Sequence, residues 1–316
     1  MNTRQLGNLW PVGALTLGGG GIGQVWGVTD RAESIATLRE AIEAGVTLID
    51  LAPGYGNGEA ENVLGEAYAG KLPAGVRVTT KCRLGNPPAS EVYRHLRESL
   101  QASLGRMRLD HVDLFFLHNL IVDEDAEGAT TRTSRSLFRE AVIPAFERLK
   151  GEGLIGAWGI TGIGVPSAII ATLGETPAPS AVQCVANLLD SPGGMARYDE
   201  APRSREIIGA AKVAGAGVMG IRAVQAGALT SNFDRELPGD HPEMRDYLRA
   251  APFRALATEV GKSPAFLAHQ YALSMAGVDT LVLGVKNREE LRECLAAEEA
   301  GPMDGELVSR IDLAMK

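Results

Sequence analysis

TLIDLAPGYGNGEAE, residues 47–61, governs the interpretation of the whole chain. Its first residues are apolar and predict a short strand that ends at Asp50, and Tyr55 follows within a run of glycines. Glycine allows a sharp backbone turn, so the chain can leave the strand and present the phenol of Tyr55. A carboxylate at a strand end and a tyrosine on the following loop are typical of a barrel whose active face consists of such loops. The alternative is an ordinary strand-to-helix turn with a surface tyrosine.

Strand and helix patterns alternate on both sides of this stretch. Apolar runs predict eight strands, at residues 12–17, 46–50, 76–80, 111–117, 154–160, 181–185, 218–221 and 280–283. Helical spacing and helix-start signals predict helices at residues 32–44, 59–69, 90–104, 137–150, 166–173, 204–214, 264–275, 287–297 and 305–315. Pro144 should bend or restart the helix that contains it.

This alternation predicts an α/β fold with a parallel sheet, and eight units predict closure into a (β/α)8 TIM barrel. The last predicted helix is an addition at the C-terminal end of the barrel. We expect a single domain over residues 1–316. Segments 123–136 and 222–249 are predicted to be irregular, and loops as long as the second often fold over a cofactor or substrate.

Composition narrows the class of function. Of the 316 residues, 45% are hydrophobic and 22% are charged, which is ordinary for a globular protein that can bury a large core. The net charge is -8 and no basic stripe is present, so nucleic acid is not an expected partner. The three cysteines lack the spacing of a disulfide framework or a zinc site, and no metal is expected. Neither a signal-peptide core nor an apolar run of the ~20 residues that a membrane helix needs is seen, so we expect a reducing, cytoplasmic setting without membrane attachment.

The glycine run at residues 18–23 contains a G-x-G-x-x-G match, which suggests a dinucleotide-binding fingerprint. Such a fingerprint should open a helix at its last glycine and have an acidic residue about 20 positions further on. Here the chain continues with QVWGVTD before any helix, and Asp50 lies 27 positions after Gly23. A tight loop that lets another group approach the backbone closely fits this run better than a Rossmann fold does.

Four polar side chains fall at or just after the ends of the second, third and fourth predicted strands: Asp50, Tyr55, Lys81 and His118. In a barrel these ends meet at one mouth. A tyrosine has a pKa of about 10, and an adjacent ammonium, held by a carboxylate, would lower it. Tyr55 would then serve as a general acid for a carbonyl oxygen or as a general base for an alcohol, while His118 orients the same oxygen.

Each of these residues has a structural alternative. Lys81 could be a solvated lysine at a strand end, His118 a hydrogen-bonded core histidine, and Asp50 a helix cap. Their occurrence together, in this order at successive strand ends, favours the catalytic interpretation.

The segments LIDLAPGYGNGEAENVLGEA, VTTKC and DLFFLHN resemble the motifs of the aldo-keto reductases, and the resemblance extends from Val12 to about Ala297. It implies a nicotinamide cofactor bound extended across the barrel mouth. It also implies that Tyr55 donates the proton, that Lys81 and Asp50 tune it, and that hydride passes from nicotinamide C4 to the substrate carbon. LTLGGGGIG resembles the branch with sugar and aldose dehydrogenases.

By this resemblance a further set of residues binds the cofactor: Gly19, Gly20, Asp50, Thr161, Gln183, Asn187, Ile221, Arg222, Leu229, Gly284, Lys286, Asn287 and Glu290. Gln183 would bind the carboxamide. Gly162 lacks the second carboxamide contact, and Ile221 stands where an aromatic ring normally stacks. Arg222 either reaches the pyrophosphate or substrate, or forms a salt bridge at the barrel rim.

LGVKNREELREC resembles the segment that binds the adenosine end. Lys286 and Asn287 could meet a 2'-phosphate, because lysine is a good point-charge phosphate ligand. Glu290 replaces the usual glutamine and would repel that phosphate, and Cys294 replaces an asparagine. On balance the sequence favours NADP(H) over NAD(H).

We therefore expect an NAD(P)-dependent oxidoreductase of an aldehyde, ketone or sugar. Trp26, Tyr55 and His118 are the expected substrate contacts, although Trp26 could instead pack under its loop. The expected partners are a small carbonyl or alcohol substrate and, in a homo-oligomer, further copies of the chain. The rival interpretation is a cofactor-binding regulatory or sensing subunit on the same barrel with little turnover.

Overall fold

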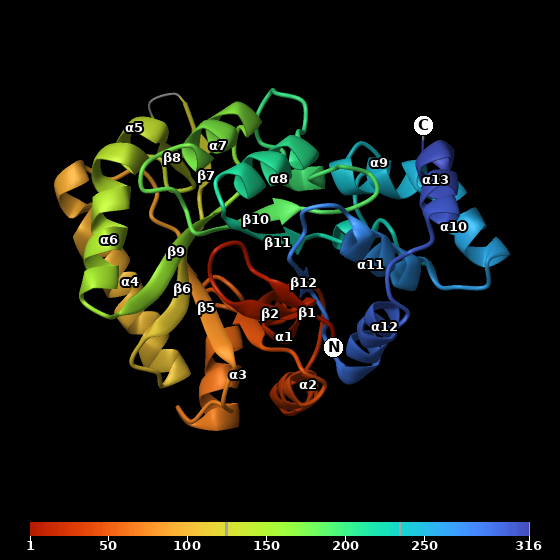
Figure 1. Cartoon of the computed structure of the whole chain (residues 1–316), viewed down its shortest axis with the longest axis horizontal. Helices are drawn as coiled ribbons and strands as arrows, with labels where there is room; N and C mark the ends of the chain where they lie inside the picture. Colours follow the sequence, from red (N-terminus) through yellow and green to blue (C-terminus); the bar gives the residue numbers. More distant parts are fainter. Residues whose placement is uncertain (124–125, 234, 316) are drawn as a thin grey trace.

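Eight parallel strands close into a barrel in the computed structural model, which describes residues 1–123, 126–233 and 235–315 (Figure 1). The barrel strands are β3 (Leu15–Gly18), β4 (Leu48–Asp50), β5 (Arg77–Cys82), β6 (Val112–Leu117), β9 (Ile155–Thr161), β10 (Ala181–Val185), β11 (Gly217–Ile221) and β12 (Thr280–Leu283). They are adjacent in sequence order, and β12 pairs with β3 to close the ring. The predicted (β/α)8 barrel is confirmed.

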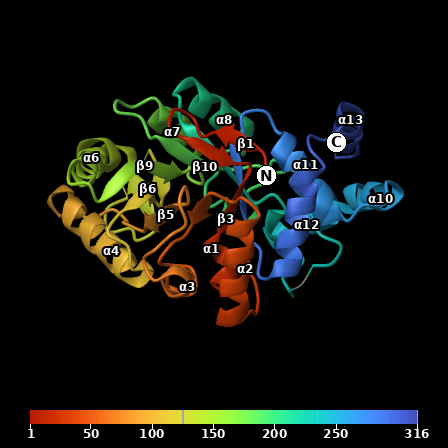
Figure 2. The same cartoon turned by 60° about the horizontal axis from the view of Figure 1, so that its bottom comes forward.

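Helices surround the barrel and bury the larger hydrophobic core against it. The main ones are α2 (Arg31–Glu43), α3 (Glu59–Tyr68), α4 (Val92–Met107), α6 (Ile143–Gly151), α7 (Pro166–Leu173), α8 (Ser204–Val213), α11 (Pro264–Ser274) and α12 (Arg288–Glu299). Figure 2 shows α3, α2 and α12 in succession on the outside of the barrel. The predicted extra helix is α13 (Gly305–Ala314), beside α10 (Ala251–Glu259).

Several helices begin where the sequence supplies a capping side chain. Asp30 accepts a hydrogen bond from the Glu33 backbone N–H (2.8 Å), and Ser263 caps α11 in the same way. Such caps satisfy backbone donors that the first turn of a helix leaves free. Pro144 lies in the first turn of α6, directly after a π-helical segment at Phe138–Val142, so the helix restarts there as predicted.

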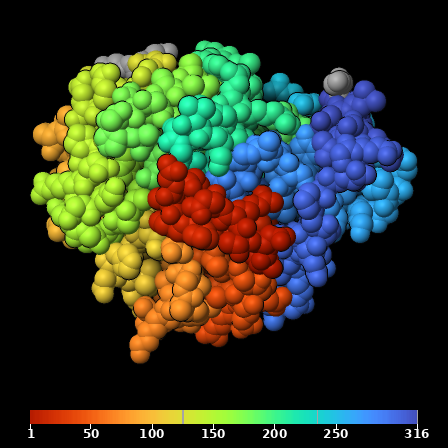
Figure 3. Space-filling model, viewed as in Figure 1, coloured from red at the N-terminus to blue at the C-terminus, as the bar shows by residue number. Residues whose placement is uncertain are grey.

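The predicted first strand, 12–17, is two strands in the structure. Its first part is β2 (Pro11–Gly13), which pairs antiparallel with β1 (Thr3–Gln5), and only its second part, β3, enters the barrel. This hairpin covers the N-terminal end of the barrel, at the centre of the face seen in Figure 3. Its apolar residues form a second core with the barrel interior, made of Leu6, Val12, Leu48, Leu114, Phe116, Ala157, Ala181 and Met219.

The two segments predicted to be irregular contain regular structure. β7 (Leu120–Val122) pairs with β8 (Arg132–Ser134), while residues 124–125 of the first segment lie outside the described residues. The second segment contains α9 (Pro242–Arg249), and α10 follows it; residue 234 is likewise not described. The buried side chains of α9 are Glu243 and Asp246, so the apolar spacing that reveals most helices is absent here.

The three cysteines are free and buried, and Cys82 packs in the larger core. Burial raises the pKa of Cys82 to about 11 and the pKa of Cys184 to about 12. Within the described part of the chain, no helix combines the length and apolar character needed to cross a lipid bilayer.

Candidate active site

A buried ion pair lies at the C-terminal mouth of the barrel. Asp50 is the last residue of β4, and Lys81 lies on the neighbouring strand β5. The Lys81 ammonium donates to Asp50 Oδ2 (2.7 Å) and to the Leu51 carbonyl oxygen (2.8 Å), and the two charged side chains are only 0% and 2% exposed. The pair therefore fixes the position of a cation beside the loop that carries Tyr55.

The second carboxylate oxygen of Asp50 is also occupied. Thr79 Oγ1 and Gln183 Nε2 each donate to Asp50 Oδ1 at 2.7 Å. Three donors from β5 and β10 thus hold one carboxylate, which explains how a charged group remains stable in this position.

Tyr55 and His118 face this pair. Lys81 Nζ lies 4.8 Å from the centroid of the Tyr55 ring. The rings of Tyr55 and His118 meet edge to face, with centroids 6.0 Å apart and an interplanar angle of 81°. The four side chains that the sequence placed at successive strand ends are therefore neighbours at the mouth.

Burial sets the protonation of these groups. It raises the pKa of Tyr55, and the Lys81 ammonium lowers that pKa only in part, so the phenol is protonated near neutral pH. Lys81 thus acts to lower the pKa of Tyr55, as the sequence predicted, but the net shift of that pKa is upward because burial has the larger effect. Burial is the largest single influence on the pKa of Lys81 and would lower it, yet Asp50 and Tyr55 together outweigh burial and the pKa is raised. Burial, with the charges of Lys81 and Arg83, lowers the pKa of His118 to about 3, so its imidazole is neutral.

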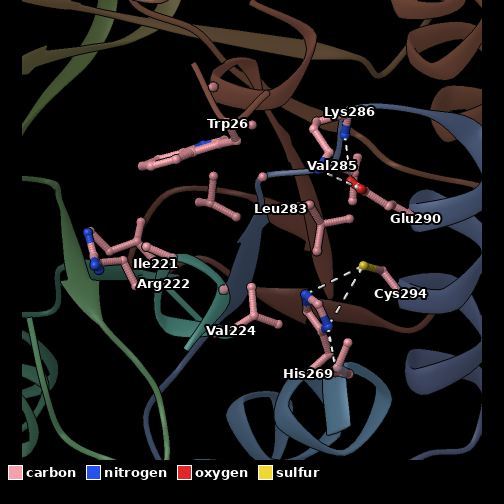
Figure 4. Close-up of a pocket in the computed structure, with 18 of the residues that line it drawn as sticks. Trp26, Ile221, Arg222, Val224, His269, Leu283, Val285, Lys286, Glu290 and Cys294 are labelled. Atoms are coloured by element: carbon pink, nitrogen blue, oxygen red, sulfur yellow. Dashed lines mark hydrogen bonds and ion pairs between the residues drawn. The ribbon is translucent and has the colours of Figure 1, made fainter. Parts of the chain in front are cut away.

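A groove of about 520 Å³ runs from these residues to the space between α11 and α12. Cavities of this size are typical of small-molecule sites. Figure 4 shows its side chains converging from the loop after β3, from the end of β11 and from α11 and α12. Most of the predicted site residues line it: Gly20, Trp26, Asp50, Tyr55, His118, Thr161, Gln183, Ile221, Arg222, Gly284, Lys286 and Glu290.

Four predicted cofactor residues do not line the groove. A Cβ on Gly19 would lie 2.9 Å from Leu51 Cδ2, so this glycine is needed for packing against the loop of Tyr55. Asn187 is buried, and its amide donates to the Arg222 carbonyl oxygen (3.1 Å). Leu229 is a core residue, and Asn287 caps α12. These residues support the walls of the groove from behind.

Arg222 forms the salt bridge at the barrel rim that was one of its two alternatives. Its guanidinium donates to Glu243 Oε1 (2.9 Å) and to Gln225 Oε1 (2.8 Å). The residue has a φ of +62°, a conformation that side chains other than glycine adopt at a cost. Arg222 thus lines the groove while holding α9 in place.

Trp26 lies over two glycines. Its indole Nε1 would be 2.5 Å from a Cβ on Gly20 and 3.3 Å from one on Gly284. The side chain is 38% exposed, so it packs on its loop and also forms one wall of the groove. Packing on its loop is therefore confirmed, and contact with a substrate stays a prediction.

The sequence analysis missed part of the site. Arg83, two residues after Lys81, is exposed, and its charge acts on both Tyr55 and His118. The far end of the groove is lined by Ser263, His269 and Glu293, which the sequence analysis did not name, and by Cys294, which it did. Glu293 could have been identified, because it lies one helical turn after Glu290 on a predicted helix. His269 could not, since nothing in the sequence brings α11 against α12.

Among the residues that the structure describes, no group of His, Cys, Asp and Glu side chains could hold a metal ion. The site has a protonated tyrosine, a fixed cation, a neutral imidazole and a long adjoining groove. This arrangement can stabilise and protonate an oxygen that gains negative charge.

The comparisons with known proteins agree with this chemistry. The model of the "Aldo/keto reductase family" matches residues 14–316. L-galactose dehydrogenase of Arabidopsis thaliana is 27% identical over 99% of this chain and 94% of that protein. A protein of Schizosaccharomyces pombe named for the beta subunit of voltage-gated potassium channels is 24% identical over 87% of this chain and 82% of its own.

Among solved structures, the holo form of aldo-keto reductase AKR11C1 from Bacillus halodurans has a TM-score of 0.74 at 23% identity, covering 100% of this chain and 97% of that one. At this identity the likeness shows a common fold. The family model, however, spans almost the whole sequence, and the chain accordingly belongs to the aldo/keto reductase family of oxidoreductases.

Proposed function

We propose that this protein is an NAD(P)-dependent oxidoreductase of an aldehyde, ketone or sugar in which Tyr55 is the general acid and base. The observation that carries this proposal is the buried Lys81–Asp50 pair placed against Tyr55, with neutral His118 on the other side. These are the groups that a carbonyl oxygen needs as it becomes an alcohol.

The residues of the groove fit a nicotinamide dinucleotide. Gln183 uses one amide N–H for Asp50, and its carbonyl oxygen accepts no hydrogen bond from the described part of the chain. It lines the groove with Thr161 and is available to a carboxamide. Ile221 offers an aliphatic surface, and Lys286 and Glu290 lie at the opposite end. When bound, the cofactor supplies the hydride.

The remaining steps belong to the protein. The Tyr55 hydroxyl donates its proton to the substrate carbonyl oxygen, and the raised pKa of Tyr55 keeps that proton in place near neutral pH. Neutral His118 donates a hydrogen bond to the same oxygen. Lys81 remains charged and stabilises the phenolate that forms. In the reverse direction, Tyr55 accepts the proton of an alcohol.

A sugar or small carbonyl compound is the proposed substrate class. A full-length relative is named L-galactose dehydrogenase, and the glycine-rich segment before Trp26 resembles that of sugar dehydrogenases. The proposed setting is cytoplasmic, because three unpaired cysteines are best maintained in a reducing compartment. Assembly into a homo-oligomer stays a prediction.

The preference between NADP(H) and NAD(H) depends on the adenosine end alone. The sequence favoured NADP(H) because Lys286 and Asn287 could meet a 2'-phosphate. In the structure Lys286 pairs with Glu290, and Asn287 caps a helix, so both side chains have protein partners.

A regulatory subunit with little turnover is the rival. One relative is named for a potassium channel subunit, but it is distant at 24% identity. The complete arrangement of Asp50, Tyr55, Lys81 and His118 favours catalysis over this rival, since cofactor binding alone would not require a positioned proton donor.

The variant Tyr55→Phe tests the proposal. It removes the proton donor and should lower turnover by about 10²–10⁴-fold. Nucleotide affinity, measured from the change in tryptophan fluorescence, should change little. The matched control is Tyr93→Phe, which removes a surface hydroxyl bonded to Glu152 (2.6 Å) and should leave turnover unchanged. Unchanged turnover in Tyr55→Phe would contradict the assignment. Tight nucleotide binding without turnover of any carbonyl or alcohol in the unmodified protein would favour the rival.

A further inference from the structure

The end of the groove between α11 and α12 carries more negative than positive charge. Its lining side chains include one cation, Lys286, and two carboxylates, Glu290 and Glu293. In Figure 4, Lys286 and Glu290 lie together at this end, with Cys294 and His269 below them and Arg222 on the opposite side. Which nucleotide can bind depends on whether Lys286 has charge available.

Lys286 is engaged by Glu290. Its ammonium lies 3.1 Å from Glu290 Oε1, and its backbone N–H donates to Glu290 Oε2 (2.8 Å). The same glutamate therefore holds both the charge and the main chain of Lys286. Its neighbour Asn287 accepts a hydrogen bond from the Glu290 backbone N–H (2.9 Å) and is used as a helix cap.

Glu293 adds a second carboxylate. Ser263 Oγ donates to Glu293 Oε1, and within the described residues no basic side chain pairs with this glutamate. The charges of Glu290 and Glu293 both act to raise the pKa of Cys294 and of His269, so their field extends into the groove. Burial outweighs that effect on His269 and lowers its pKa, which leaves the ring neutral and without positive charge to offer.

Two further cations line the groove, and neither comes from α11, α12 or the loop before α12. Arg222 and Arg235 belong to the segment after β11, where Arg222 pairs with Glu243 and Arg235 donates to the Ala226 carbonyl oxygen. The charged groove residues that α12 and the loop before it contribute are therefore two carboxylates and one cation that is already paired.

NAD(H) and NADP(H) differ only at the 2' position of the adenosine ribose. NAD(H) presents a hydroxyl there, which can donate a hydrogen bond to a carboxylate, as acidic residues do in other dinucleotide sites. NADP(H) presents a phosphate that carries close to two negative charges near neutral pH and accepts hydrogen bonds only. We propose that Glu290 and Glu293 select NAD(H) over NADP(H). This selection rests on the proposed function, because it concerns the same cofactor groove.

Direct titration tests the selection without measuring turnover. The unmodified protein should bind NADH at least tenfold more tightly than NADPH, followed by the change in tryptophan fluorescence. Glu290→Gln removes one negative charge beside Lys286 and should tighten NADPH binding about tenfold or more, with NADH affinity changed less than threefold. Glu293→Gln should shift the ratio in the same direction. The matched control is Glu289→Gln, on the exposed side of the same helical turn, which should leave the ratio unchanged.

Competition with adenosine 5'-monophosphate and with adenosine 2',5'-bisphosphate isolates the adenosine end. Adenosine 5'-monophosphate should be the better competitor in the unmodified protein. Adenosine 2',5'-bisphosphate should bind more tightly to Glu290→Gln than to the unmodified protein. Equal or tighter binding of NADPH by the unmodified protein would overturn the selection and leave the oxidoreductase assignment intact. The selection would also be overturned if neither Glu290→Gln nor Glu293→Gln changed the ratio of NADH affinity to NADPH affinity. Failure to bind either dinucleotide would overturn the proposed function together with the selection.

Discussion

Lys81 is the residue whose removal should affect both stability and chemistry. In Lys81→Met, Asp50 would remain buried and charged with only Thr79 and Gln183 as donors. Breaking a buried ion pair on one side costs about 3–5 kcal/mol. We expect a loss of stability in that range, measured by urea unfolding at neutral pH. The double variant Asp50→Asn with Lys81→Met removes the unpaired charge and should recover part of the loss. A single variant as stable as the unmodified protein would contradict this account.

At the level of single residues, the sequence predicted which side chains meet at the barrel mouth. It did not predict all of their hydrogen-bond partners or the direction of their pKa shifts. Asp50, Tyr55, Lys81 and His118 could be found because strand ends converge in any parallel barrel. The bond from Gln183 to Asp50 could not, since it joins β10 to β4 across the barrel. The net pKa direction of Tyr55 was also beyond the sequence, because burial and charge act in opposite directions and only the structure shows which is larger.

At the level of elements, α9 is held to the barrel by polar contacts instead of an apolar face. Asp246 accepts hydrogen bonds from Ser191 Oγ (2.6 Å) and Gln225 Nε2 (2.7 Å), while Glu243 pairs with Arg222. Sequence analysis left this segment irregular for that reason. Most helices with apolar faces were predicted, with ends that differ by a few residues, but α10, which buries Phe253, Leu256 and Ala257, was missed.

The variant Asp246→Ala should loosen α9 without unfolding the barrel. It removes the acceptor of the partly buried Ser191 hydroxyl and one of the two acceptors of the buried Gln225 amide, and an unsatisfied buried donor costs about 1–3 kcal/mol. We expect faster amide hydrogen exchange in residues 242–249 and unchanged exchange in the barrel strands, because local opening can occur well below the free energy of global unfolding. Asp240→Ala, at an exposed position just before α9, is the control and should leave exchange unchanged. Faster exchange throughout the barrel would show that α9 is not a separable unit.

At the level of the whole molecule, the eight-strand alternation predicted the closed barrel, whereas the cover over its N-terminal end was not predicted. Residues 12–17 (VGALTL) read as one strand, and nothing in that pattern marks the point where the chain passes from the hairpin into the barrel. The division depends on the hairpin partner, β1, which is too short and polar to stand out. The repeated strand–helix pattern therefore predicts the barrel. The cover over its N-terminal end depends on the pairing of β1 with β2, which the pattern does not show.

The fold should lose stability in mild acid in a way that depends on His118. The folded pKa of His118 is about 3, and a histidine in an unfolded chain has a pKa near 6.5. Between these values only the unfolded chain binds the proton, so stability is full above pH 6.5 and falls as the pH decreases toward 3. At pH 5 the protein has lost ~2 kcal/mol of folding stability through this one group.

Urea unfolding at pH 7.5 and at pH 5 measures this effect. The loss of stability between the two pH values should be smaller in His118→Gln than in the unmodified protein, because every other titrating group is common to both. Equal losses would show that His118 is solvated enough to bind its proton in the folded state.

The burial of all three cysteines has a practical consequence for spectroscopy. Thiol-reactive dyes and spin labels attack the thiolate at an accessible sulfur. Burial removes the access at all three native cysteines, and it also raises the pKa of each thiol, Cys294 in the groove included, so the thiolate is disfavoured. A cysteine introduced on an exposed surface position could therefore be labelled selectively without first replacing the native three. A probe placed in this way on α9, with a second on the barrel, would report the distance between them as nucleotide binds.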